Sequence, residues 1–182
     1  MTRERAGIII RDTTDPDLAA MLAILNAEIA DSPYIYAETP VTLDQRRAWL
    51  AALRSANLPA LVAAEIDEAG EVVGWAALSP YRSSSGYRFT AELSVYVART
   101  AHRRGIGTQL IAALEDRARS GGIHALVGSV DAENAASLTL LERFGFVEAA
   151  RLPEVGRKFG LWRTQLLVVK ILRPERFPAL DR

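Results

Sequence analysis

Cysteine is absent from the 182-residue sequence, which excludes disulfide bonds, zinc–thiolate sites and a cysteine nucleophile. Lysine is scarce, with only Lys158 and Lys170, so arginine supplies nearly all of the basic charge. The 22 basic residues balance 22 acidic ones, whereas nucleic-acid-binding proteins normally carry a basic face. We therefore expect no nucleic-acid partner.

Long apolar runs are also lacking, since none approaches the roughly 18 residues that a membrane-spanning helix needs. Residues 1–7 are charged and contain no apolar signal core. A metal site has no support either, because His124 stands isolated and such a site needs several converging ligands. These absences predict a cytoplasmic protein with no membrane partner and no metal.

The hydrophobic pattern predicts one mixed α/β domain with a substantial core. β-Branched and apolar runs predict strands at 8–10, 61–64, 72–76, 87–97, 125–130, 146–150 and 161–172. Apolar residues at helical spacing predict helices over 16–29, 42–53, 105–119 and 134–144, and Trp49, Trp75 and Phe144 are assigned to the core. We expect the domain to span residues 1–172, followed by a loose tail over 173–182.

Two helix starts carry capping signals. Asp15 precedes the first helix as its predicted N-cap. Thr42 precedes the second, and Gln45 completes a capping box. The intervening residues 31–40 are predicted to form a loop that exposes Tyr36.

The most informative segment is a glycine-containing helix start that follows a strand and a short loop. It reads Arg103-Arg104-Gly105-Ile106-Gly107-Thr108. Free N–H groups at a helix N-terminus point outward, and the helix dipole favours an anion there. Glycine lets a phosphate approach the backbone closely, and arginine adds opposite charge. The segment alone is compatible with a pyrophosphate site or with a plain tight turn into a helix.

Two other nucleotide-binding motifs are excluded. A dinucleotide fingerprint needs a third glycine at the position of Leu110, and a phosphate loop needs Gly-Lys-Ser/Thr, which does not occur.

The order of motifs favours the pyrophosphate interpretation. After the glycine segment come a strand, Asp131-Ala132-Glu133-Asn134 at a helix start, and Glu142-Arg143-Phe144-Gly145-Phe146 at the end of that helix. In this order the sequence resembles the GNAT superfamily of acyl-CoA-dependent acetyltransferases. The narrower resemblance is to phosphinothricin and methionine sulfone/sulfoximine N-acetyltransferases, and it rests on residues 87–92, 94–97, 131–137 and 154–162. The similarity extends from about Ile8 to Leu172.

This resemblance implies an α/β (α+β) fold of the GNAT type. Its central sheet would be mixed, mostly antiparallel and twisted, with about seven strands, a V-shaped cleft between two splayed strands, and about four flanking helices. The implied co-substrate is acetyl-CoA, and the implied assembly is a homodimer. The residues expected to bind acetyl-CoA are Val95, Tyr96, Val97, Arg103, Arg104, Gly105, Ile106, Gly107, Thr108, Asn134 and Ser137. For Asn134 a simple helix N-cap is the alternative, and both roles are compatible.

Glu92 is the general base that the resemblance implies. An amine must be neutral before it attacks, whereas a free α-amino group titrates near pH 8, roughly. A carboxylate on a strand that lines a cleft can remove that proton directly or through a water molecule. The alternative is an ordinary exposed glutamate on a strand.

Three positions depart from the family pattern. His102 stands where GNAT proteins usually have Gln or Arg. Leu141 stands where Tyr, or His in the herbicide-acetylating relatives, is thought to protonate the departing thiolate. Thr164 replaces an acidic residue, which puts the substrate preference of those relatives in doubt.

The acceptor is expected to be a small amine, such as an amino acid or an analogue. Residues expected to contact it are Tyr36, Glu38, Arg82, Tyr87 and Arg88, and an arginine could pair with an amino-acid carboxylate. Two alternatives stay open at this point: another amine (a polyamine, an aminoglycoside or a protein N-terminus), or an acyl-CoA-binding module that has lost catalysis, as Leu141 suggests.

Overall fold

The computed structural model describes residues 7–66 and 70–172. The predicted loose tail over residues 173–182 lies outside the described residues. The strands are β1 (Ile8–Asp12), β2 (Ala60–Glu65), β3 (Val72–Pro80), β4 (Thr90–Val97), β5 (Ala125–Asp131), β6 (Val147–Lys158) and β7 (Leu161–Ile171). The helices are α1 (Leu18–Asp31), α2 (Leu43–Ser55), α3 (Ile106–Ser120) and α4 (Ala135–Arg143), with short 3-10 helices η1 (Asp15–Asp17), η2 (Ser85–Tyr87) and η3 (Arg99–Ala101).

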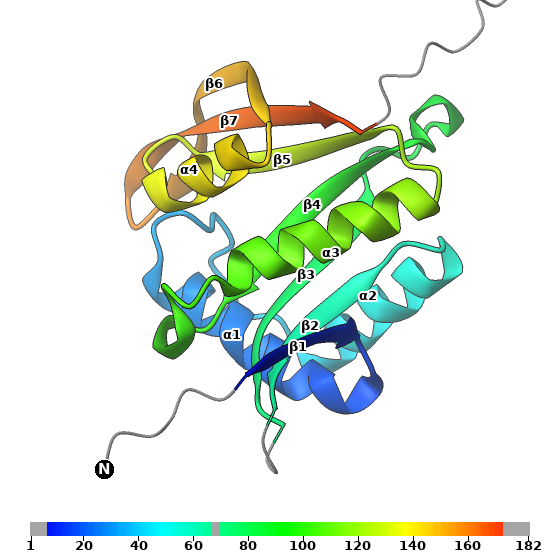
Figure 1. The fold of residues 1–182 in the computed structure, drawn as a ribbon. Coiled ribbons are helices and arrows are strands. Elements are labelled where there is room, and N and C mark those ends of the chain that lie inside the picture. Colours follow the sequence, from blue (N-terminus) through cyan, green and yellow to red (C-terminus); the bar gives the residue numbers. More distant parts are fainter. Residues whose placement is uncertain (1–6, 67–69, 173–182) are drawn as a thin grey trace, which may run out of the picture.

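The strands form one sheet in the order β1-β2-β3-β4-β5-β7-β6. All neighbours are antiparallel except β4 and β5, which run parallel. Helices α1 and α2 cover one face, and α3 and α4 cover the other (Figure 1). This arrangement confirms the predicted mixed, mostly antiparallel sheet flanked by helices.

Alternation along β3 divides the interior into two cores. Ala76 and Leu78 point to the core that contains the inward face of α3. Trp75 and Ala77 point to the opposite core, which α1 and α2 cover. Because successive strand residues face opposite sides of a sheet, one strand can serve both helix layers.

The sheet splays between its two parallel strands. β4 pairs with β5 only from Thr90 to Glu92, although β4 continues to Val97 and β5 to Asp131. Beyond Glu92 the two strands diverge, each still paired on its outer side with β3 or β7. The predicted V-shaped opening is therefore present, and Glu92 lies where it begins.

The first helix starts later than predicted. Residues 15–17 form the 3-10 helix η1, whose N-cap is Thr14, and α1 begins at Leu18. Asp17, not Asp15, accepts a hydrogen bond from the backbone N–H of Thr14, at 2.7 Å. The predicted capping box of Thr42 and Gln45 is confirmed at α2.

Three strands differ from their predicted limits by three residues or more. β3 was expected to end at residue 76 but continues to Pro80. β4 begins at Thr90 because residues 85–87 form η2. β6 was expected to end at residue 150 but continues to Lys158, with an irregular register between Leu152 and Gly156. Glu154 has a positive φ of 54° there, and such an interruption breaks the alternation that marks a strand in sequence.

Of the aromatic residues assigned to the core, Trp75 is fully buried, whereas Trp49 and Phe144 are half-buried at its margins. No helix in the described part of the chain is long and apolar enough to cross a membrane. The cytoplasmic location stays a prediction.

Candidate active site

The free edge of β4, residues 93–97, is the centre of the candidate site. β3 pairs with this segment on one side, and no pairing with β5 extends beyond Glu92. Backbone N–H and C=O groups that point away from β3 therefore face the opening of the sheet. Among them, the carbonyl of Val97 is already hydrogen-bonded to the His102 ring, at 3.0 Å. An extended ligand can add to such an edge as a strand does. The predicted cofactor residues Val95, Tyr96 and Val97 all lie on it.

The N-terminus of α3 lies beside this edge. Gly105 caps the helix in the left-handed region, at φ 75°, a conformation that favours glycine. A Cβ added at Gly107 would lie 3.0 Å from Leu140 of α4 and 4.0 Å from Val97 of β4. Gly107 thus lets the helix start approach both neighbours, and the structure brings the predicted residues of β4 and α3 together.

The side chains of this helix start have different environments. Arg103 is exposed, whereas Arg104 forms an ion pair with Glu65 of β2 at 2.6 Å. Ile106 is buried in the core beneath the helix. An anion at this helix start would therefore meet backbone N–H groups and the Arg103 guanidinium, because the Arg104 side chain is directed to β2.

Glu92 lies at the point where β4 and β5 diverge. Its side chain is half-buried, and its Oε1 atom accepts a hydrogen bond of 2.7 Å from the hydroxyl of Ser129 on β5. Ala91 and Leu93 point into the α3-side core, so alternation places Glu92 on the opposite face, together with Tyr96. The carboxylate is consequently oriented by a neighbour and open on one side.

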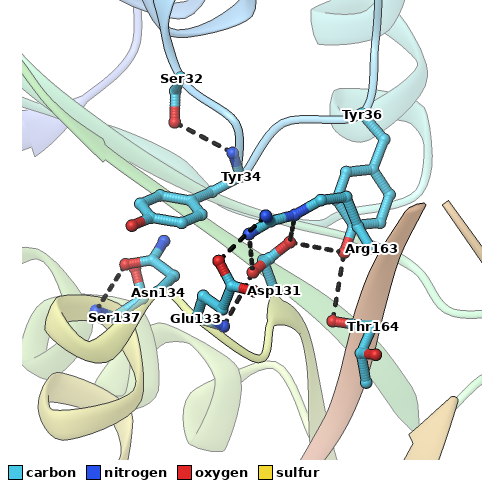
Figure 2. A network of polar contacts seen from close by, with 9 residues as sticks. All are labelled: Ser32, Tyr34, Tyr36, Asp131, Glu133, Asn134, Ser137, Arg163 and Thr164. Atoms are coloured by element: carbon cyan, nitrogen blue, oxygen red, sulfur yellow. Dashed lines mark hydrogen bonds and ion pairs between the residues drawn. The ribbon is translucent and has the colours of Figure 1, made fainter. Parts of the chain in front are cut away.

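Asp131, at the end of β5, is the centre of a polar network (Figure 2). Arg163 of β7 donates to both of its carboxylate oxygens, from Nη2 at 2.7 Å and from Nε at 2.8 Å. The hydroxyl of Tyr36 donates to Oδ2 at 2.9 Å, and the backbone N–H of Glu133 donates to Oδ1 at 2.8 Å. Burial opposes ionisation of Asp131, but these hydrogen bonds outweigh it and lower the pKa.

The start of α4 follows directly from this network. Asn134 is the N-cap of the helix, and its Oδ1 atom accepts the backbone N–H of Ser137 at 3.1 Å. The capping interpretation of Asn134 is therefore confirmed. The cap uses only the carbonyl oxygen of the side chain, which leaves its NH₂ group as a donor toward a ligand.

The loop between α1 and α2, residues 32–42, is attached to the β6–β7 hairpin. The ring of Tyr36 lies against Gly156, where an added Cβ would come within 2.2 Å of it. The buried amino group of Lys158 donates to the carbonyl of Ile29, at 2.6 Å, and to that of Ala37. These contacts give structural roles to Gly156 and Lys158 within the motif at residues 154–162.

The five residues predicted to contact the acceptor do not form one cluster. Tyr36 belongs to the Asp131 network, and Glu38 lines a small cavity of about 240 Å³ beside Lys158. The other three, Arg82, Tyr87 and Arg88, line a separate cavity of about 410 Å³. Within that group, the Arg82 guanidinium lies 5.2 Å from the ring centre of Tyr81 and 5.7 Å from that of Tyr87.

Leu141 has no acidic proton to donate, and it serves as a core residue. It is buried in the α3-side core, and its Cδ1 atom lies 3.4 Å from where a Cβ on Gly128 would be. Tyr36, a tyrosine of the same site, does not supply that proton either. Burial, followed by its hydrogen bond to Asp131, raises the pKa of Tyr36 to about 12, and its proton is already donated to that carboxylate.

A buried cation lies on the same face of the sheet as Glu92. Arg46 of α2 is stacked between Trp49 and Trp75, 3.6 and 4.0 Å from the two ring centres, and Tyr96 stacks on Trp75. Its Nε and Nη2 atoms have no hydrogen-bond partner among the described residues. Burial lowers the pKa of Arg46 to about 10, so the side chain remains charged at neutral pH.

Four residues of the site were not predicted from sequence: Arg46, Ser129, Asp131 and Arg163. Asp131 lies in a recognised motif, but its role depends on Arg163, which is 32 positions away. The sequence signal for Arg163 was its place directly after Trp162. Nothing in the local pattern distinguished Arg46 from the other arginines of an amphipathic helix.

Comparison with known proteins gives consistent results. Residues 21–146 match the family model described as Acetyltransferase (GNAT) family. An L-methionine sulfoximine/L-methionine sulfone acetyltransferase of Pseudomonas paraeruginosa is 41% identical over 92% of this chain and 96% of its own length. A phosphinothricin N-acetyltransferase of Alcaligenes faecalis is 37% identical over 92% of this chain and 84% of its own length.

Among solved structures, yncA from Salmonella typhimurium, determined with its cofactor acetyl-CoA, superposes with a TM-score of 0.89. It is 34% identical and covers 95% of this chain, and the match includes 98% of that structure. Sequence motifs, sheet topology and relatives therefore agree. The chain belongs to the GNAT acetyltransferase family, and it is an N-acetyltransferase similar to the methionine sulfoximine/sulfone and phosphinothricin enzymes.

Proposed function

We propose that the protein transfers the acetyl group of acetyl-CoA to the primary amine of a small amino acid or analogue of the methionine sulfone, methionine sulfoximine or phosphinothricin type. One observation carries the proposal. The unpaired edge of β4 lies between an anion-binding helix start and the carboxylate of Glu92. Acetyl-CoA bound along this edge would have its pyrophosphate at the start of α3 and its thioester near Glu92, the proposed general base.

The described residues fit acetyl-CoA. The free edge at residues 93–97 offers backbone groups to the pantetheine arm, and one N–H there polarises the thioester carbonyl. The N–H groups at the start of α3 and the exposed Arg103 receive the pyrophosphate. Arg104 and Ile106 contribute through their backbone only, because their side chains are engaged elsewhere. The side-chain amide of Asn134 and the nearby Ser137 complete the cofactor side.

Glu92 removes one proton from the acceptor ammonium, directly or through a water molecule. The neutral amine then attacks the thioester carbon and the C–N bond forms. The nitrogen gives its second proton to water, and the C–S bond breaks. Ser129 holds the carboxylate toward the opening by donating to Oε1. General-base catalysis of this kind contributes about 10²- to 10⁴-fold to a rate.

Coenzyme A departs as its thiolate and takes a proton from water. Leu141 cannot donate one, and Tyr36 already donates its proton to Asp131. A thiol titrates near pH 8.5, roughly, so its thiolate is a tolerable leaving group at neutral pH. The reaction therefore proceeds without an acid at the position of Leu141.

Arg82 is the residue that we assign to bind the carboxylate of the acceptor. Its guanidinium has no carboxylate partner among the described residues, and it lies against the rings of Tyr81 and Tyr87 at a cavity large enough for a small molecule. Arginine binds carboxylates through two parallel hydrogen bonds. Glu38 and Arg88 stay predicted contacts of the acceptor side.

A homodimer is the assembly we propose. The tip of the β6–β7 hairpin exposes four large apolar side chains, between 56% and 64% of their surface: Val155, Phe159, Leu161 and Trp162. Exposed apolar clusters of this kind are typical of protein–protein contacts. Light scattering after gel filtration is expected to give twice the mass of the 19.9 kDa chain, and a mass of one chain would contradict the proposal.

The proposed reaction is tested by thiol release from acetyl-CoA. The acceptor panel contains L-methionine sulfone, L-methionine sulfoximine, phosphinothricin, spermidine, an aminoglycoside and an alanine-terminated peptide. We expect acceptor-dependent turnover with one of the first three. The product is expected to be about 42 mass units heavier than the acceptor, because an acetyl group replaces one hydrogen. Turnover with the peptide or polycations alone would reject the acceptor class, and turnover with none would favour a binding module.

A further inference from the structure

Asp131 joins three segments that lie far apart in the sequence. Its carboxylate accepts hydrogen bonds from the loop between α1 and α2 through Tyr36, from β7 through Arg163 and from the turn before α4 through Glu133 (Figure 2). Its side chain is 1% exposed and that of Arg163 is 6% exposed. A buried carboxylate is stable only when its oxygens are satisfied, so removing one donor affects the whole arrangement.

The acceptor side of the network is the Tyr36 hydroxyl. It donates to Oδ2 of Asp131 at 2.9 Å and lies 3.3 Å from the carbonyl oxygen of Thr164. The same Oδ2 atom also accepts a hydrogen bond from Nε of Arg163, which holds the carboxylate in the orientation that the Tyr36 hydroxyl needs. The middle of the loop between α1 and α2 is thereby held against the end of β5.

The cofactor side of the network is the turn from Asp131 to Asn134. Oδ1 of Asp131 accepts the N–H of Glu133, and the backbone carbonyl of Asp131 accepts the N–H of Asn134 at 3.0 Å. Arg163 also reaches the Glu133 carboxylate at 3.0 Å, from its Nη1 atom. The orientation of the Asn134 side chain at the start of α4 therefore depends on the same carboxylate.

We propose that Asp131 is a positioning residue that couples the binding of the acceptor to the binding of coenzyme A. This inference rests on the proposed function, because it uses the cofactor role of Asn134 and the acceptor contact predicted for Tyr36. An acceptor that contacts this loop stabilises the bond from Tyr36 to Asp131, and Asp131 in turn fixes the turn that presents Asn134. The coupling is reciprocal, so coenzyme A tightens acceptor binding by the same factor.

The control for this proposal is a second arginine–aspartate pair with the same chemistry. Asp17, at the start of α1, accepts both terminal nitrogens of Arg11 at 2.7 Å, the N–H of Thr14 at 2.7 Å and the hydroxyl of Thr14 at 2.8 Å. It is 6% exposed and belongs to the turn between β1 and α1. Asp17→Asn removes equivalent interactions away from the proposed site.

The experiment measures the dissociation constant of L-methionine sulfone by calorimetry, with and without saturating coenzyme A. For the wild type and Asp17→Asn, coenzyme A is expected to tighten binding about fivefold or more, the lower range of typical couplings. For Tyr36→Phe and Asp131→Asn, the ratio of the dissociation constants without and with coenzyme A is expected to fall to about one. Tyr36→Phe deletes one hydroxyl from a surface loop, so it tests the proposal even if Asp131→Asn does not fold.

Kinetics on the same proteins separate positioning from stability. Tyr36→Phe is expected to raise the KM for the sulfone about fivefold, the size of the lost coupling, because its hydroxyl bonds Asp131. The double variant with both Tyr36→Phe and Asp131→Asn is expected to be no worse than Asp131→Asn alone. A wild-type ratio of one, or variants that keep the wild-type ratio, would overturn the coupling. If the wild type transfers no acetyl group at all, the proposed function fails instead, so the two failures are distinguishable.

Discussion

The cofactor side and the acceptor side of the β4 edge are built from different kinds of contact. On the cofactor side, ligand groups meet backbone: the free edge at residues 93–97 and the N–H groups that follow Gly105. The proposed acceptor side depends instead on contacts between distant segments: the Tyr36 ring packs against Gly156, and Lys158 donates to the backbone carbonyl of Ala37. We therefore expect cofactor use to be a property of the fold and acceptor choice to depend on a few long-range contacts.

Gly156→Ala is expected to have the largest effect on this comparison. The new Cβ would lie 2.2 Å from the Tyr36 ring, so the ring must move. Overpacking of this kind costs about 1–3 kcal/mol, and we expect kcat/KM for the acceptor to fall about 10- to 100-fold. Coenzyme A binding, measured by calorimetry, is expected to weaken less than the acceptor does. An unchanged kcat/KM for the acceptor would show that the contact between Tyr36 and Gly156 does not affect acceptor use.

Asp17→Asn is expected to have an intermediate effect, on stability alone. Hydrogen bonds from Arg11, and then those from Thr14, outweigh burial and lower the pKa of Asp17 to about 2. A depressed pKa stabilises the fold above the unfolded-state pKa, and this stability is lost as the pH falls from about 4 toward 2. Asp17→Asn is therefore expected to lower the free energy of unfolding by on the order of 1–2 kcal/mol at pH 7, a figure that allows for the partial exposure of Arg11.

Urea unfolding between pH 2 and pH 7 measures this effect. The variant is expected to have a flatter dependence of its unfolding free energy on pH than the wild type. A slope equal to that of the wild type would mean that the Arg11–Asp17 pair contributes nothing.

Gly107→Ala is expected to have the smallest effect, and on the opposite side of the edge. Its Cβ would lie 3.0 Å from the flexible end of Leu140, which can move aside. We expect the KM for acetyl-CoA to rise about threefold, corresponding to roughly 0.6 kcal/mol, with the acceptor KM nearly unchanged. Steady-state kinetics with each substrate varied in turn test this, and a larger change for the acceptor would reverse the comparison.

Local signals explain which features could be predicted from sequence. The capping box at Thr42, the glycine turn at Gly105 and the N-cap at Asn134 each depend on neighbours within a few residues. The mixed, mostly antiparallel sheet and its splay followed from the resemblance, which covers nearly the whole chain, and not from the pattern of the strands alone. The order of the strands was not predicted.

Long-range contacts explain what was missed. The pair of Asp131 and Arg163 joins β5 to β7, and neither residue has a local pattern that indicates the other. The far half of β6 was missed because the bulge near Glu154 breaks its alternation. The predicted acceptor residues were individually plausible polar or aromatic side chains, but they lie on two separate loops, residues 32–42 and 81–89, and do not share one cavity.

The most direct test of the account compares the wild type with Glu92→Gln. Both proteins are assayed for acetyl transfer to L-methionine sulfone between pH 6 and pH 9, and the dissociation constant of coenzyme A is measured on the same preparations. We predict a fall in kcat of about 100-fold or more at pH 7, partly recovered at high pH where the amine is already neutral, and an unchanged coenzyme A constant. Equal rates at all pH values would contradict the assignment of Glu92 as the base at the opening of the sheet.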